Sequence, residues 1–247
     1  MLIKLIKYDL LADYKKYCTV FAAMLLLSIM MLMSENSSYS AFVFSESGSV
    51  IDIILFMSYT IVSVAAALMV VVFSISRFYT NLIQDEGYLM HTLPVPTWQL
   101  LASKLITTYI WATATVLMEI VCAALATGER RIFSDIISSI TEITTNRDAA
   151  ETMLYVLMSP FYLMSRIYLV CGLGNLFSKN KKGIAVVMYF VIQFIEGIFT
   201  TYVTMLVTLN VTAFSGYMFV KIVLALALSV GYFIAAERLF AKRLNLE

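Results

Sequence analysis

Charged residues are scarce in this sequence. They occupy 13% of its 247 positions, whereas hydrophobic residues occupy 61%. A soluble globule of this size needs more polar surface than that to cover it in water. The shortage of charge therefore excludes an ordinary soluble domain, and a formal net charge of only +1 argues against a nucleic-acid partner.

Histidine and cysteine are also rare, which bears on catalysis and metal binding. His91 is the sole histidine, and Cys18, Cys122 and Cys171 each fall in an apolar stretch without paired or metal-type spacing. No cluster of His, Cys and carboxylate residues could hold a metal or perform catalysis. We therefore predict no catalytic residue, no metal site and no cofactor in this chain, and we interpret the cysteines as packing residues.

Long apolar runs are what the sequence has in abundance. A helix needs about 20 apolar residues to cross a hydrocarbon core of about 30 Å, and no alternating segments typical of a membrane barrel occur. We predict an all-α polytopic protein, a single transmembrane domain over 1–247. The six expected spans are Tyr17 to Met33, Ile51 to Ile75, Leu105 to Thr127, Met153 to Phe177, Ile184 to Thr208 and Tyr217 to Ala236.

Residues 1–16 precede the first span and have no compact apolar core with a cleavage site. We expect no removable signal peptide, and the first span is then its own insertion signal. The apolar residues Leu2, Ile6 and Leu10 recur at helical spacing, with lysines on another side. We predict a helix lying at the inner membrane interface, as an anchor for the first span or as a force-transmitting element.

The distribution of Lys and Arg predicts the orientation. With both termini cytoplasmic, 13 basic residues fall on the inner side and 4 on the outer side, as the positive-inside rule requires. The inner set is Lys4, Lys7, Lys15, Lys16, Arg77, Lys104, Arg166, Lys179, Lys181, Lys182, Arg238, Lys242 and Arg243, although Arg166 lies within an expected span. The outer set is Arg130, Arg131, Arg147 and Lys221.

The segment 77–104 joins the second and third spans on the cytoplasmic side. Asp85 or its neighbours can cap a short helix, which Pro94 and Pro96 then end, and Thr97 can cap the next helix. The short helix would present Glu86 to His91 to the cytoplasm. From the residues alone, it either docks into a groove on a partner protein or forms an interfacial turn with its aromatic side chains among the headgroups.

The same segment contains a distinctive run of residues. The run is Arg77-Phe78-Tyr79, Asn81-Leu82, Asp85-Glu86-Gly87-Tyr88-Leu89-Met90, Thr92-Leu93-Pro94-Val95 and Gln99-Leu100 to Ser103-Lys104. It resembles the signature of small permease subunits of bacterial type-2 ABC exporters, and the six-span layout with its N-terminal interfacial helix is similar over the whole chain. The narrower similarity is to Firmicute exporters of antimicrobial or cytolytic peptides, including the phenol-soluble modulin exporters.

This resemblance implies a bacterial plasma-membrane permease homodimer that works with two ABC ATPase subunits, which bind ATP and Mg. It implies that a coupling helix fits into a cleft of the ATPase. The residues implied are Asp85, Glu86, Gly87, Tyr88, Leu89, Met90, His91 and Thr92. The sequence agrees by omission, because it contains no G-x-x-x-x-G-K-[ST] phosphate loop. The expected cargo is amphipathic peptides or other hydrophobic compounds.

Three ionisable residues fall inside expected spans, where each is a candidate functional residue. They are Glu119, Arg166 and Glu196. A buried ion pair between Arg166 and either glutamate would fix helix packing, and we favour Glu119 as the partner. Glu196 is the candidate for the translocation path, where its carboxylate would attract the basic part of a peptide. Near the end of the fourth span, Gly172 and Gly174 predict close helix packing.

Two other classes of function stay open. A membrane-anchored immunity or sensor component would bind a toxic peptide without a transport cycle. An ion-coupled carrier would follow an ion gradient and ignore ATP, although the sequence lacks the internal repeats common in such carriers.

Overall fold

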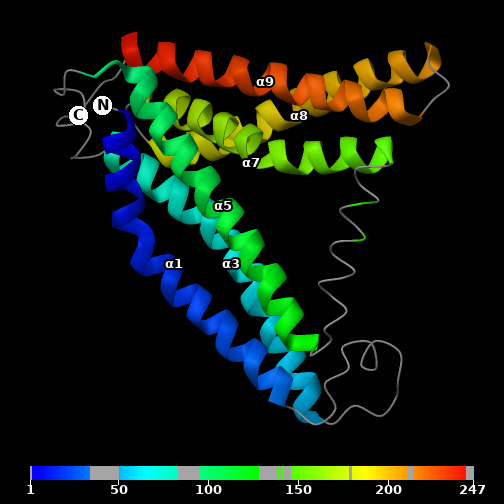
Figure 1. The fold of residues 1–247 in the computed structure, drawn as a ribbon. Helices are drawn as coiled ribbons and strands as arrows, with labels where there is room; N and C mark the ends of the chain where they lie inside the picture. Colours follow the sequence, from blue (N-terminus) through cyan, green and yellow to red (C-terminus); the bar gives the residue numbers. More distant parts are fainter. Residues whose placement is uncertain are drawn as a thin grey trace. The chain divides into compact units, whose positions relative to one another are not determined.

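The computed structural model describes residues 2–33, 50–82, 95–127, 138, 141, 146–177, 180–210 and 214–242. In these ranges the protein is built from six helices that are long and apolar enough to cross a membrane (Figure 1). They are α1 (Leu2–Met33), α3 (Val50–Leu82), α5 (Thr97–Thr127), α7 (Arg147–Gly174), α8 (Lys181–Asn210) and α9 (Phe214–Lys242). The prediction of an all-α protein with six spans is confirmed.

The helices extend beyond the apolar runs that predicted them. Residues 2–16, where we expected an interfacial helix ahead of the first span, are helical. They continue into the first span without a break, so that both form one helix, α1. No Pro or Gly interrupts residues 2–33, so nothing in the backbone stops the helix at the membrane boundary. For the same reason α5 begins at Thr97 and α7 at Arg147, before the expected spans.

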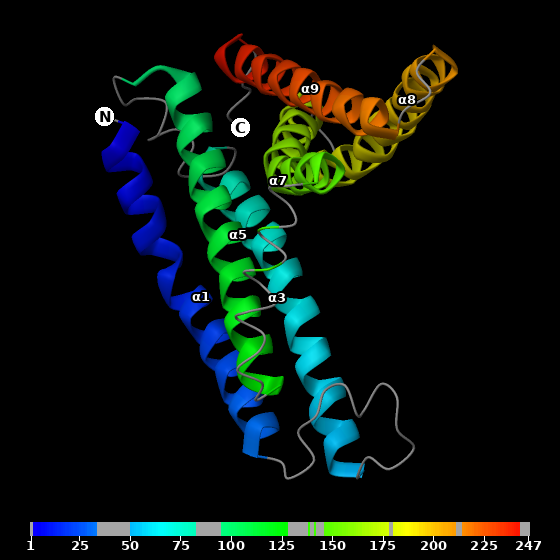
Figure 2. The ribbon, with the colours of Figure 1, turned by 45° about the vertical axis from the view of Figure 1, so that its right-hand side comes forward.

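The chain divides into two compact units. One contains α1 with residues 50–73 of α3 and residues 107–127 of α5, and both ribbon views show these helices side by side (Figures 1 and 2). The core residues of this unit include Met24 and Cys122, which are fully buried. Between α1 and α5 of this unit, the ring of Tyr17 stacks on Trp111 with a centroid distance of 4.0 Å.

The other unit contains α7, α8 and α9 together with residues 74–82 of α3 and residues 95–106 at the start of α5. Its central element is α7: 44% of its most apolar stretch is buried, against 17% or less in every other span. Helix α9 packs mainly along α7, and α8 contacts both, as Figure 2 shows. The candidate functional site lies among these three helices.

Helix α7 contains Pro160, which cannot donate the backbone hydrogen bond to the carbonyl four residues before it. That carbonyl, of Val156, instead accepts a hydrogen bond of 2.7 Å from the hydroxyl of Ser159. A neighbouring serine thus satisfies the backbone group that proline leaves open, as membrane helices require. The helix is capped at its start by Asn146, whose side chain accepts from the backbone N–H of Asp148 at 3.1 Å.

The end of α7 packs closely against its neighbours, as the glycines predict. A Cβ on Gly172 would lie 3.1 Å from the ring of Phe240 in α9. A Cβ on Gly174 would lie 2.8 Å from both the side chain of Ala185 and the backbone oxygen of Lys181. Gly174 therefore leaves no room for a side chain, because a backbone atom lies in the way, whereas a side chain at Gly172 would require the Phe240 ring to shift.

Many hydroxyl groups bond to a carbonyl of their own helix, three or four residues earlier. These donors are Ser28, Ser58, Thr60, Ser103, Thr113, Thr115, Thr152, Ser159, Ser165, Thr200, Thr204 and Ser229. Each hydroxyl therefore has a hydrogen-bond acceptor at membrane depth without needing a partner on another helix.

Candidate functional site

Arg166 of α7 and Glu196 of α8 form an ion pair in the middle of the three-helix unit. The guanidinium Nη1 donates to the Oε2 of Glu196 at 3.1 Å. The two side chains are only 6% and 5% exposed. A charge removed from water in this way is stable only when paired, so the geometry satisfies the main requirement for keeping both charges.

Two tyrosines hydrogen-bond to the pair, and one of them comes from the third helix. Tyr232 of α9 donates its hydroxyl to the same Glu196 oxygen at 3.0 Å. On the other side, Arg166 Nη2 donates to the hydroxyl of Tyr189 at 3.0 Å. The rings of Tyr162 and Tyr189 also lie 5.3 and 4.8 Å from the guanidinium carbon, within range of a cation–π attraction.

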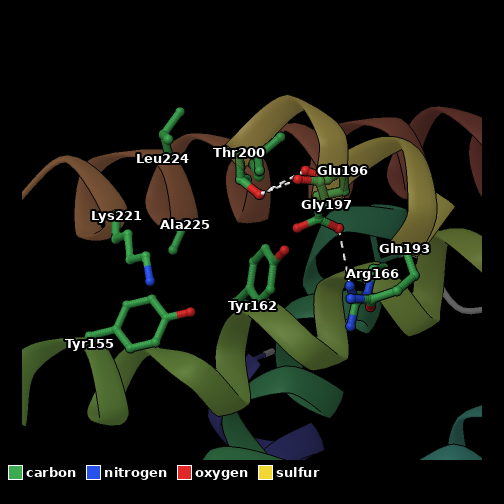
Figure 3. Close-up of a pocket in the computed structure, with 11 residues that line it drawn as sticks. Tyr155, Tyr162, Arg166, Gln193, Glu196, Gly197, Thr200, Lys221, Leu224 and Ala225 are labelled. Carbon is green, nitrogen blue, oxygen red and sulfur yellow. Dashed lines mark hydrogen bonds and ion pairs between the residues drawn. The ribbon is translucent and has the colours of Figure 1, made fainter. Parts of the chain in front are cut away.

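The ion pair forms part of the wall of a cavity of about 250 Å³, shown in Figure 3. The lining residues are Tyr155, Tyr162 and Arg166 from α7, Gln193, Glu196, Gly197 and Thr200 from α8, and Lys221, Leu224, Ala225 and Leu228 from α9. At about 30 Å³ per water molecule, this is space for about eight waters. The pocket can therefore hold a small ligand or one end of a larger one.

The sequence of α8 explains why its polar groups gather in the pocket. Gln193, Glu196 and Thr200 recur at a spacing of three and four residues, which places them on one face of the helix. Gly197 lies within the same face, and a Cβ there would meet no atom within 4 Å. The glycine therefore leaves open space in the pocket wall, unlike Gly174, which is required by packing.

The structure changes the assignment of the three membrane charges. We favoured Glu119 as the partner of Arg166, and this is wrong, because Arg166 pairs with Glu196. Glu119 lies in the other compact unit, where its Oε1 accepts from the hydroxyl of Ser63 at 3.4 Å. Glu196 does line a pocket, but Arg166 and Tyr232 already bind its carboxylate.

The predicted coupling residues, Asp85, Glu86, Gly87, Tyr88, Leu89, Met90, His91 and Thr92, lie outside the described residues. The segments on either side of them are described, and both belong to the α7–α9 unit. On the flank that precedes the coupling residues, the ring of Phe78 in α3 is fully buried. It stacks on Tyr168 of α7 with a centroid distance of 3.9 Å, and the ring of Phe240 in α9 lies edge-on to it with a centroid distance of 5.6 Å.

After the predicted coupling residues, Thr97 is the first residue of α5, close to where a helix start was expected. Its hydroxyl donates to the carboxylate of Glu237 in α9 at 3.1 Å. At the start of α5, the backbone N–H of Gln99 donates to the backbone carbonyl of Pro96 at 2.9 Å. Both flanks of the segment are therefore attached to helices that carry the pocket.

Sequence reasoning missed most of the pocket. Tyr162 lies four residues before Arg166, and Tyr189 lies seven before Glu196, so helical spacing around each charge could have indicated both tyrosines. Lys221 and Tyr232 carry no such signal, because they come from a third helix whose rotation the sequence does not specify. Among the described residues, no group of three or more His, Cys, Asp or Glu side chains could hold a metal ion.

Comparison with known proteins gives no assignment: no family model, no curated protein and no solved structure matches this chain.

Proposed function

We propose that this chain is the membrane-spanning subunit of an ATP-driven type-2 ABC exporter. Two copies would work with two ATPase subunits to move amphipathic peptides or other hydrophobic compounds out of a bacterial cell. The observation that carries the proposal is the attachment of both flanks of segment 83–94 to the unit that contains the polar pocket. The sequence of that segment resembles the coupling region of such exporters.

The contacts on the first flank connect the segment to the pocket through α7. Phe78 stacks on Tyr168, which lies two residues after Arg166 on the same helix. Because a close-packed interior has little free space, a displacement of Phe78 must displace Tyr168 as well. A push on the loop would therefore reach the helix that carries the arginine of the ion pair.

The second flank connects the segment to the pocket through α9. Thr97 binds Glu237, and Tyr232, five residues earlier on α9, binds Glu196. Movement of the loop would thus act on two of the three pocket helices from both of its ends. Such movement of packed helices is a common way to convert a local event into a conformational change.

The first test is whether the chain has an ATPase partner. The tagged chain, extracted from its native membrane in mild detergent, should co-purify with an ATP-binding-cassette protein, and the complex should hydrolyse ATP. The double variant Glu86→Ala/Tyr88→Ala should lose both the partner and ATP-driven export. Asp148→Ala, in the first turn of α7, is the control variant, and it should retain both the ATPase partner and ATP-driven export.

Two outcomes would overturn the proposal in favour of the alternatives. Transport that follows an ion gradient and does not respond to ATP would identify an ion-coupled carrier. Tight peptide binding without any ATPase partner or transport would identify an immunity or sensor component. Unchanged export in Glu86→Ala/Tyr88→Ala would contradict the docking mechanism itself.

A further inference from the structure

The first half of α1 separates its charges by sign. In residues 2–16 both carboxylates, Asp9 and Asp13, are buried and have interaction partners. Every lysine of the same stretch is exposed. The sequence alone does not show this separation, because it places the two acids among the lysines. The exposed lysines are Lys4, Lys7, Lys15 and Lys16.

Three of these lysines form one basic face. Lys16 pairs with Asp13 at 3.6 Å. Lys4, Lys7 and Lys15 have no carboxylate partner among the residues that the structure describes. Residues 4, 7, 11 and 15 recur at a spacing of three and four, which places them on one side of the helix. This side of α1 therefore carries three positive charges that no described carboxylate matches.

Large apolar side chains lie among the lysines. Ile3 is 82% exposed, Tyr8 69% and Leu11 53%, and the ring centroid of Tyr14 lies 6.0 Å from the Lys15 ammonium. Water is an unfavourable environment for so much apolar surface, and hydrocarbon is an unfavourable environment for lysine. The headgroup layer accommodates both, since tyrosine rings and lysine side chains extend into it. The exposed face of α1 therefore fits the surface of a bilayer.

The length of α1 places the lysines at the edge of the membrane. The helix has 32 residues (Figure 1), which is about 48 Å, whereas a bilayer with its headgroups is about 40–45 Å thick. About 20 residues counted back from Met33 fill the hydrocarbon, so its boundary lies at about residue 13. Lys7 and Lys4 then lie about 9 and 14 Å beyond that boundary. The headgroups fill about 5–8 Å of this distance, and charges act over about 8 Å in physiological salt. The lysines are thus within range of headgroup charge.

We propose that the exposed face of residues 3–15 in α1 is a binding surface for anionic phospholipids. The three unmatched lysine ammoniums bind lipid phosphate, while Tyr8 and Leu11 insert between the headgroups. A lysine beside an anionic surface gains about fivefold in affinity, and a zwitterionic headgroup gives no such gain because it has no net charge. The inference holds for whichever leaflet this end of α1 enters, and it does not depend on the export function.

The test counts the lipids held by the full chain without an ATPase. The chain is reconstituted in nanodiscs of phosphatidylcholine with a minor share of phosphatidylglycerol that has the same acyl chains. Native mass spectrometry of the released protein then counts the lipids of each kind that remain bound. We expect phosphatidylglycerol to be retained about fivefold above its share of the bilayer. A higher ammonium acetate concentration should reduce this enrichment, because salt screens the attraction.

Two triple variants assign the enrichment to this face. Lys4→Gln/Lys7→Gln/Lys15→Gln removes the positive charges and should lower the enrichment from about fivefold towards unity. Lys4→Arg/Lys7→Arg/Lys15→Arg keeps the charges at the same positions and should keep the enrichment. Because all three side chains are exposed, both variants should unfold at the wild-type temperature, which thermal unfolding in detergent checks.

Two outcomes would overturn the inference. Retention of phosphatidylglycerol at its share of the bilayer would show that the chain does not prefer an anionic lipid. Equal enrichment in the Gln and Arg variants would show that the anionic lipid binds elsewhere on the chain. Because no ATPase is present, neither result bears on the export proposal, which is judged by its own experiment.

Discussion

Arg166 is buried in the α7–α9 unit, and three side chains from α7 and α8 surround its charge. Glu196 and Tyr189 bind its two terminal nitrogens, while Tyr162 and Tyr189 present their rings to it. Its remaining nitrogen, Nε, has no hydrogen-bond partner among the described residues. Removing one member of such a buried pair costs more than removing both, because the survivor keeps an uncompensated charge.

This asymmetry gives a prediction for the ion pair. Arg166→Met should destabilise the protein by about 3–5 kcal/mol, because Glu196 would stay buried with Tyr232 as its donor. The double variant Arg166→Met/Glu196→Met should recover most of the loss. Thermal unfolding in detergent measures both, with Glu119→Gln as a control outside this pair. A double variant as unstable as the single one would contradict the prediction.

The sequence identified the ionisable residues inside the spans, but it did not identify which of them contact each other. Glu119, Arg166 and Glu196 were identified because charges at membrane depth are costly and therefore rare. The partner of Arg166 was assigned wrongly, because the choice depends on how one helix is rotated and shifted against another. Spacing along a single chain segment contains no information about that rotation.

The helices themselves were predictable from long apolar runs, but their ends were not. Hydropathy detects the 20 or so residues inside hydrocarbon, whereas a helix continues until its backbone hydrogen bonds are interrupted or capped. Asn146 provides such a cap for α7, seven residues before the expected start of that span. In α1 the interface segment and the span have no break between them.

Two glycines on neighbouring helices should respond to the same substitution in opposite directions. Gly174→Ala places a Cβ 2.8 Å from a backbone oxygen, so one helix must move, at a cost of about 1–3 kcal/mol. Gly197→Ala enters open space and should stabilise α8 by up to about 1 kcal/mol. Thermal unfolding of the two variants side by side tests this. Equal effects would show that packing does not require Gly174.

Helix α3 offers a matched pair of phenylalanines for testing how the loop acts on the pocket. Phe78 contacts Tyr168 and Phe240, whereas Phe73, five residues earlier, contacts Tyr17 in the other unit at 5.6 Å. Phe78→Leu and Phe73→Leu should each lose aromatic contacts worth about 0.5–1.5 kcal/mol.

The two leucine variants should differ in transport. In proteoliposomes with the ATPase, Phe78→Leu should lower the amount exported per ATP hydrolysed, because it weakens the link between the loop and α7. Phe73→Leu should leave that ratio unchanged. Equal ratios in both variants would argue that Phe78 does not transmit the movement.

For the whole molecule, the six confirmed helices and the distribution of basic residues predict both termini inside the cell. In a variant with the three native cysteines replaced by alanine, Lys4→Cys and Asn146→Cys place one thiol at each expected side; both positions are exposed. A membrane-impermeant maleimide added to intact cells should label Asn146→Cys and not Lys4→Cys. The reverse pattern would invert the topology.

The hydroxyl groups that bond within their own helices affect how easily the spans can slide. Ser165 of α7 and Thr204 of α8 each donate to a carbonyl of the helix that carries them, so these bonds travel with the helix and survive any displacement. Resistance to sliding then comes from steric contacts and from bridges such as Arg166–Glu196. Sliding of α7 against α8 would therefore leave these hydroxyl bonds intact but would have to break or rearrange the Arg166–Glu196 bridge between the two helices.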